Sequence, residues 1–337
     1  MHRFIRSVGF AGLKNRRDED WLIQKITREF TTETRFTSPD GEEQVALDVV
    51  LGKGLGVTLR GSWREDGSFR HEFYYPWLRG GQTSTMVPCQ VERHAEKAGF
   101  SGFLEDVKLG FMLIFFVQNG IQYEKRAGNA EIAFQSGGIR LSGLSVNGCV
   151  MLPLHKTEEQ VEVAKAVAQA KIELIEAAKR GDEEAMETLT IGEYNEAAVI
   201  AERVQTEDVY SIIDTSFMPC GVESDHYAVL GTITEARQVK NRWTDETVHV
   251  LKVECNDITF DIAINDADLA GVPEPGRRFK GDIWLQGQLE MPHQMPGAGQ
   301  WPGLDGLLGG MPGGPGNDGL IPPGNGPEPG DPFGWLM

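Results

Sequence analysis

Apolar residues alternate with polar ones, or form short runs, along most of the first 155 positions. Helical spacing appears once in this part, over residues 18–28, where Trp21, Leu22 and Ile26 fall on one face. The rest has the period of strands and is interrupted by glycine and proline turns. The predicted strands are 45–51, 56–63, 69–75, 89–94, 107–117, 121–125, 131–134, 139–146 and 149–154. One helix and many strands predict an α+β fold with a mainly antiparallel sheet.

The pattern becomes helical after residue 156. Helices are predicted over 161–179, 182–189 and 191–204, and Gly181 follows two basic residues where the first of them should end. That first helix is apolar on two faces, because Val161 and Ala168 lie on one side and Val163 and Val167 lie near the other. So wide an apolar surface has to be covered by the body or by a second copy of the chain, and we expect the body.

Strand patterns return after residue 207. Predicted strands cover 227–239, 247–255 and 258–264, and a helical turn at 266–271 precedes a last strand over 278–289. Three strands, a small helix and a further strand are typical of a small β-barrel of the oligonucleotide/oligosaccharide-binding type. Barrels of this kind serve many functions, so the fold alone predicts none.

The last 47 residues, 291–337, contain 14 glycines and 10 prolines and cannot supply a packed core. We therefore predict four parts: an α+β domain over 1–155, a helical connector over 156–206, a barrel-like domain over 207–290 and a disordered tail over 291–337. Apolar residues in the tail are either incidental or anchors for a protein partner. They are Trp301, Leu304, Leu307, Leu308 and Met311, and then Phe333, Trp335, Leu336 and Met337.

The chain has 50 acidic and 32 basic residues, a net charge of −18. Such a field repels phosphate backbones and anionic lipids, so nucleic-acid binding is disfavoured. The longest apolar run, 109–117, is half of the ~20 residues that span a bilayer. The cysteines Cys89, Cys149, Cys220 and Cys255 form no close pair, which fits a reducing compartment. We expect a cytoplasmic protein, and the oligomeric state stays open.

Catalytic chemistry has one candidate, a cluster of charged residues on two predicted strands. If these strands were neighbours, His71, Glu72, Arg93 and His94 could converge, with histidine and carboxylate as acid and base and arginine as an anion holder. The alternative is cross-strand ion pairs on a solvated sheet. The segment 52–56 lacks the spacing of a phosphate loop, and the cysteines lack metal spacing, so we expect no cofactor and no metal.

Single-stranded nucleic acid is an alternative ligand for the barrel. Cations beside an aromatic residue are what a single-strand groove uses, and the first barrel hairpin offers such a set. Residues 226–290 nevertheless hold seven basic and eleven acidic residues, and binding would have to overcome that balance. The residues concerned are Arg237, Lys240, Arg242, Trp243 and Lys252.

Several stretches resemble a bacterial family of unknown function from clostridial-type anaerobes, and the resemblance spans most of residues 1–290 but not the tail. It implies a bacterial, cytoplasmic protein in which both folded halves belong to one unit. It supplies no catalytic or binding residues. The stretches are 1–10, 71–80, 91–103, 113–119, 207–212, 217–219 and 278–287.

Taken together, these patterns favour a non-enzymatic binding or scaffold protein whose tail engages a protein partner. The two alternatives are single-stranded nucleic-acid binding by the barrel and an enzyme that uses the histidine cluster.

Overall fold

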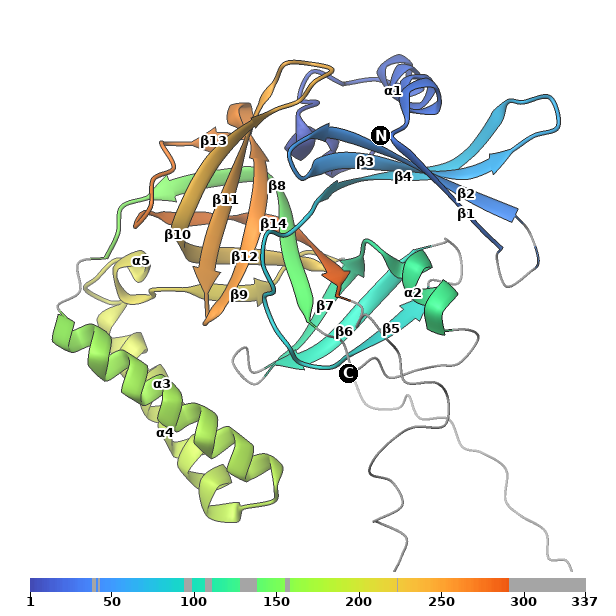
Figure 1. Cartoon of the computed structure of the whole chain (residues 1–337). Helices are drawn as coiled ribbons and strands as arrows, with labels where there is room; N and C mark the ends of the chain where they lie inside the picture. Colours follow the sequence, from blue (N-terminus) through green and yellow to red (C-terminus); the bar gives the residue numbers. More distant parts are fainter. Residues whose placement is uncertain are drawn as a thin grey trace, which may run out of the picture. The chain divides into compact units, whose positions relative to one another are not determined.

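Two β-sheets form the framework of the computed structural model (Figure 1). The structure describes residues 1–37, 41, 43–93, 99–106, 111–127, 138–154, 158–222 and 224–290. The predicted disordered tail (291–337) and the predicted strand 131–134 lie outside the described residues. The first sheet, sheet A, is antiparallel, with the order β1-β2-β3-β4. Its strands are β1 (Thr32–Thr37), β2 (Glu43–Gly52), β3 (Leu55–Trp63) and β4 (Phe69–Leu78).

The chain start covers one face of sheet A. A short helix, η1 (Arg3–Val8), leads to helix α1 (Arg16–Glu29). Asn15 caps α1 by accepting hydrogen bonds from the backbone N–H groups of Arg17 and Asp18, which satisfies donors that the helix leaves unpaired. Leu22 and Ile26, four positions apart, are fully buried in the same apolar cluster as residues of β2 and β3.

The second sheet, sheet B, closes into a five-stranded barrel. Its ring runs β8-β12-β11-β10-β14 and back to β8, because β14 pairs with both β10 and β8. The short strands β9 (Ser216–Pro219) and β13 (Leu269–Ala270) pair with β10 and β8. The ring strands are β8 (Ile139–Met151), β10 (His226–Lys240), β11 (Thr247–Cys255), β12 (Ile258–Asn265) and β14 (Arg278–Leu289).

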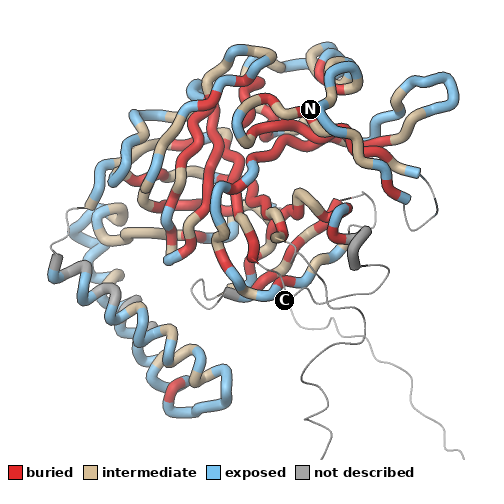
Figure 2. The backbone as a smooth tube through the Cα atoms, viewed as in Figure 1, coloured by how far each residue is buried: buried red, intermediate tan, exposed pale blue. Residues whose placement is uncertain are grey.

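Alternation along the barrel strands separates an interior core from the outer surface. On β12, Phe260, Ile262 and Ile264 are buried in the interior cluster, whereas Ala263 belongs to the cluster shared with sheet A. Burying one face of each strand fixes the register, since a shift by one residue would turn every apolar side chain outward. The buried positions of the barrel strands form a continuous core (Figure 2).

The ring has the strand arrangement of an oligonucleotide/oligosaccharide-binding barrel in a changed chain order. In that barrel the third and last strands are parallel neighbours that close the ring. Here β12 and β8 are parallel neighbours, but β8 precedes the other four strands in the sequence. The small helix expected after β12 is present as η2 (Asp266–Asp268). The barrel therefore takes one strand from the part of the chain before the helical connector.

Three further strands extend sheet B beyond the barrel: β5 (Cys89–Arg93), β6 (Phe100–Asp106) and β7 (Phe111–Val117). Phe115 of β7 is fully buried between two glycines. A Cβ atom at Gly102 or Gly287 would come within 2.3 and 2.4 Å of its ring. Only glycine lets both backbones approach so closely.

The connector is a helical hairpin inserted between barrel strands, with α3 (Glu158–Lys179) and α4 (Glu183–Arg203) lying side by side (Figure 1). Gly181 takes a φ of +90° at the turn, which glycine adopts without strain. Asp182 then caps α4 by accepting from the backbone N–H groups of Glu184 and Ala185. A short helix, α5 (Val209–Ile212), leads back to the barrel.

Some sequence predictions are wrong in detail. Residues 121–125 lie in helix α2 (Gly120–Ala127), not in a strand. Ile121 and Tyr123 are both buried, and an apolar pair two positions apart is too short a pattern to distinguish the period of a helix from that of a strand. Strand β4 continues through Pro76 to Leu78. An edge strand tolerates proline because the missing N–H would not have to donate a hydrogen bond to a neighbouring strand. The strands predicted at 139–146 and 149–154 are one strand, and the helices predicted at 182–189 and 191–204 are one helix.

A buried polar network joins the two sheets where β4 ends. Gln286 of β14 is fully buried, and its Nε2 donates to the carbonyl of Pro76 at 2.9 Å. Gln118 Nε2 donates to Gln286 Oε1 at 2.9 Å and to the carbonyl of Leu78 at 2.7 Å. Ser142 of β8 donates to the same carbonyl at 2.6 Å. Side chains from β14, from β8 and from the turn after β7 thus satisfy backbone groups of sheet A.

We expect Gln286→Leu to destabilise the fold by roughly 3 kcal/mol, because each buried group left unpaired costs about 1–3 kcal/mol. Urea unfolding of the full chain measures this. Gln288→Leu, two positions along the same strand and half-buried, is the control and should change stability by about 0.5 kcal/mol or less. Equal losses in the two variants would show that the network does not join the sheets.

Candidate functional site

The predicted catalytic residues lie on strands of different sheets. His71 and Glu72 are on β4 in sheet A and are exposed, with Glu72 3.9 Å from Arg70. Arg93 ends β5 in sheet B, 5.9 Å from the ring of Phe100. His94 lies outside the described residues. Because β4 pairs with β3 and β5 pairs with β6, the two strands are not neighbours, and these described side chains are not brought together in one sheet.

The cations of the first barrel hairpin are engaged within the fold. Lys240 pairs with Asp245 at 3.3 Å, and Lys252 pairs with Glu235. Trp243 packs edge-on against Phe10 and Trp21, with ring centroids 6.3 and 6.4 Å away, and the Lys25 ammonium lies 4.9 Å from its centroid. Trp243 is thus held between the chain start and the barrel. Arg242 lies 5.9 Å from this same ring, and Arg237 donates to the carbonyl of Lys53.

The outer face of β11 and β12, where a base would stack in a nucleic-acid-binding barrel, is largely covered. Val248, Val250 and Ala263 are almost fully buried and share a cluster with η1, α1 and sheet A. Asn241 strengthens this contact by donating to the carbonyls of Val8 and Gly9 at 2.8 and 3.1 Å. Sheet A and the chain start thus occupy the strand face that nucleic-acid-binding barrels of this type use.

One buried carboxylate lies on the same outer side of the barrel. Asp261 of β12 is 6 % exposed and accepts a hydrogen bond from the backbone N–H of Gly81 at 2.7 Å. Burial raises the pKa of Asp261, while the Gly81 N–H and the charges of Arg237 and Lys252 act in the opposite direction. The carboxylate fixes the segment that follows β4, so it has a structural role.

Among the residues that the structure describes, no cluster of three or more His, Cys, Asp or Glu side chains could hold a metal ion. None of the described helices has both the length and the apolar character that crossing a membrane requires. Burial raises the pKa of the Cys89 and Cys255 thiols to about 12, so both stay protonated and unreactive at neutral pH.

Six of the fifteen exposed large apolar side chains among the described residues lie on the helical hairpin: Val163, Val167, Met186, Ile191, Tyr194 and Val199. Most of the hairpin's described positions are exposed, several are half-buried, and Ala185 is buried (Figure 2). The expectation that the body covers α3 does not hold for Val163 and Val167, which are 58 % and 62 % exposed. Such a hairpin has apolar surface that is not buried within its own fold.

The most regular exposed pattern is on α4 and is called here the α4 seam: Ile191, Tyr194, Ala198 and Ala201. All four are exposed, and Tyr194 is 77 % exposed. Their spacing of three, four and three residues is the heptad spacing by which one helix packs along another. The spacing is present in the sequence. The sequence pattern predicts two helices, 182–189 and 191–204, and therefore does not identify the seam as part of one long helix.

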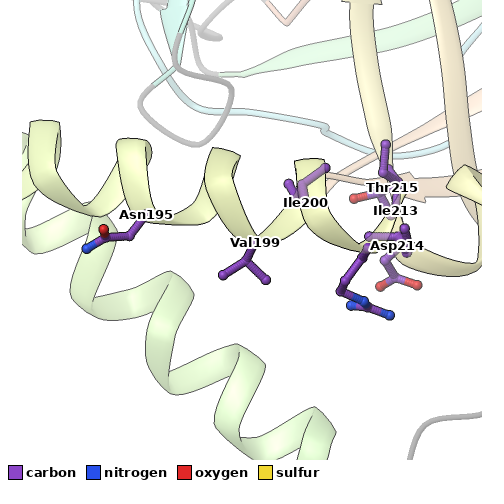
Figure 3. Close-up of a pocket in the computed structure, with 8 residues that line it drawn as sticks. Asn195, Val199, Ile200, Ile213, Asp214 and Thr215 are labelled. Carbon is purple, nitrogen blue, oxygen red and sulfur yellow. The ribbon is translucent and has the colours of Figure 1, made fainter. Parts of the chain in front are cut away.

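A pocket of about 560 Å³ lies at the base of α4. Asn195, Val199 and Ile200 line it from the helix, and residues 213–215 line it from the segment after α5 (Figure 3). Its Arg203 is bound to Glu207 by two hydrogen bonds of 3.0 and 2.7 Å, which leaves the helical wall mainly apolar. The pocket continues the apolar surface of the hairpin towards the barrel.

A second pocket, of about 500 Å³, is lined by Val209, Tyr210 and Ile213 together with residues of β8, β9, β10 and β14. The ammonium of Lys280 lies 4.2 Å from the centroid of the Tyr210 ring, and a hydrogen bond that it donates to the Tyr210 hydroxyl raises the pKa of Lys280. Cys149 and Asp282 also line this pocket.

The hairpin is strongly acidic. Residues 158–203 contain 12 Asp and Glu and 5 Lys and Arg, a net charge of −7. The exposed apolar positions of α3 and α4 are therefore set in a negative field, and the complementary surface would be apolar and positively charged. The predicted partner-binding residues of the tail, Trp301 to Met311 and Phe333 to Leu336, lie outside the described residues.

The chain belongs to a family defined by a domain of unknown function, described from an E. rectale gene (DUF3881), whose model matches residues 5–287. This confirms the resemblance recognised in the sequence. The matched range spans both sheets and the hairpin. Comparisons with curated proteins and with solved structures find no match.

We expect Asp261→Asn to stabilise the protein at about pH 7.5. Because the pKa of Asp261 is raised by folding, the folded state binds more protons than the unfolded state between the two pKa values. The free energy of unfolding of the wild type therefore falls as pH rises through that window. Asparagine can still accept the hydrogen bond from the Gly81 N–H but carries no charge. The difference in the free energy of unfolding between the variant and the wild type should therefore shrink as pH approaches about 4. Urea unfolding across this pH range measures it, and a pH-independent difference would contradict it.

Proposed function

We propose that this member of the family is a non-catalytic binding or scaffold protein of the bacterial cytoplasm that binds a protein partner through its helical hairpin and its tail. The observation that carries this proposal is the exposed apolar surface of a hairpin that the domain itself includes. A cytoplasmic location accords with the four free cysteines, of which Cys89 and Cys255 are buried.

The apolar and acidic surface of the hairpin favours a basic amphipathic helix of another protein as its binding partner. Heptad-spaced apolar positions on α4 suit a helix laid alongside it, and the charge of −7 over 158–203 suits lysine and arginine at the flanks. A second copy of this hairpin is disfavoured, because it would bring two acidic surfaces together.

The tail is the second element of the proposal. Its two apolar clusters, 301–311 and 333–337, are set in a segment without Lys or Arg, so short anchors could be ordered on a partner while the glycines and prolines between them stay solvated. Hairpin and tail together would give two points of attachment, which raises the apparent affinity for a partner that can reach both.

We expect the full chain to bind a model 18-residue helix with leucine at heptad core positions and lysine elsewhere, measured by fluorescence anisotropy. Tyr194→Glu should weaken this binding by about tenfold or more, because it places a charge in the α4 seam. Val272→Glu, at a 60 % exposed position in a loop of the barrel domain, is the matched control.

Both substitutions add a negative charge, so binding by charge alone would strengthen in both. A weakening confined to Tyr194→Glu shows that apolar contact with the seam carries the interaction. Equal affinity of the two variants, or binding of a scrambled peptide of the same composition, would contradict the proposal. A dimer in light scattering that Tyr194→Glu dissociates would identify a second copy as the occupant.

For the tail, we expect a pull-down with the full chain to retain at least one protein that the truncation 1–290 loses. Replacing Trp301, Leu304 and Leu307 by serine should lose the same protein, because these side chains would be its anchors. Quantitative mass spectrometry of the three eluates makes the comparison. Identical sets of bound proteins would exclude a role for the tail in partner binding.

A further inference from the structure

Arg60 of β3 is the one side chain among the described residues whose buried polar atoms have no hydrogen-bond partner. The residue is 3 % exposed, and Nε and Nη1 of its guanidinium both lack an acceptor. An arginine is almost never buried unless it is paired, because taking its charge out of water is costly. Something that the described side chains do not supply must therefore compensate it.

Two aromatic rings flank this guanidinium. Its central carbon lies 5.2 Å from the ring centroid of Phe36 on β1 and 5.9 Å from that of Tyr75 on β4. Both aromatic residues are themselves buried, with exposures of 6 % and 4 %. The rings stabilise the cation through their faces but offer no in-plane acceptor to its N–H groups. The charge is thus held between aromatic rings with its Nε and Nη1 donors unsatisfied.

No described carboxylate forms an ion pair with Arg60. Asp48 lies on the same face of sheet A, but its Oδ1 accepts from the hydroxyl of Thr58 at 2.5 Å. The pairing register places Ala46 and Phe73 beside Arg60 on the neighbouring strands, and both are apolar. The described surroundings are therefore suited to an anion from outside.

We propose that Arg60 binds the carboxylate of a small organic monoanion with an apolar body. A single guanidinium balances a single negative charge, whereas a phosphate dianion would leave one charge unpaired in a buried site. The aromatic neighbours Phe36, Phe73 and Tyr75 favour an apolar or aromatic body over a sugar or a polyol. This site is on sheet A and is independent of the partner surface proposed for the hairpin.

Benzoate is the probe, and benzamide is its neutral counterpart of the same shape. We expect 20 mM sodium benzoate to raise the thermal unfolding midpoint of the full chain by about 2 °C or more relative to sodium chloride at the same ionic strength, because it binds the folded state. Benzamide should give no shift. Arg60→Met should abolish the benzoate shift, and Arg64→Met, at an exposed arginine of the same β-hairpin, should retain it.

Arg60→Met removes the unpaired charge while keeping an apolar side chain, so without benzoate it should unfold at or above the wild-type temperature. If that variant does not fold, saturation-transfer NMR on the wild type decides, with transfer to benzoate and none to benzamide expected. The proposal is overturned if benzoate gives neither a thermal shift nor saturation transfer, or if the shift persists in Arg60→Met. A variant much less stable than the wild type, together with no response of the wild type to benzoate, would show that another group of the chain is the acceptor.

Discussion

The hydrogen bonds around Gln286 determine how the two sheets meet. An edge strand such as β4 has unpaired backbone groups, and burying them without partners would oppose folding. Side chains of Gln286, Gln118 and Ser142 take the place of a neighbouring strand and satisfy the backbone at Pro76 and Leu78. Because two of them come from the barrel strands β14 and β8, the position of sheet A depends on the barrel being complete.

That arrangement decides which surfaces remain for other molecules. With sheet A and the chain start against β11 and β12, the outer barrel face most often used by this type of fold becomes part of the protein core. The partner binding that we propose is accordingly assigned to additions to the barrel. The hairpin between β8 and β9 is such an addition, and its apolar residues are exposed because the core does not need them. In this proposal the packed sheets provide the stability of the fold and the hairpin provides the contact with a partner.

Much of this fold could be predicted from local pattern. The alternation along β2, β3, β11 and β12 and the glycine after α3 identify those elements correctly, because each depends on neighbours in sequence. Contacts between distant residues could not be predicted. Nothing local shows that Arg60 is buried without an acceptor or that Gln286 reaches Pro76. The histidine cluster is compact in sequence, yet His71 and Arg93 lie on strands of different sheets, because strand pairing does not follow sequence proximity.

The changed strand order of the barrel has a consequence for biosynthesis. β8 is synthesised early, yet its antiparallel partner β14 is the last strand of the domain, and the two pair from Met151 with Arg278 to Ile139 with Leu289. Contacts of such high sequence separation form slowly, whereas the hairpin between them is local and folds as soon as it emerges. On the ribosome, the apolar side of β8 must therefore remain unpaired until nearly the whole domain has been translated, which exposes this strand to chaperones and to aggregation for longer than the strands that follow it.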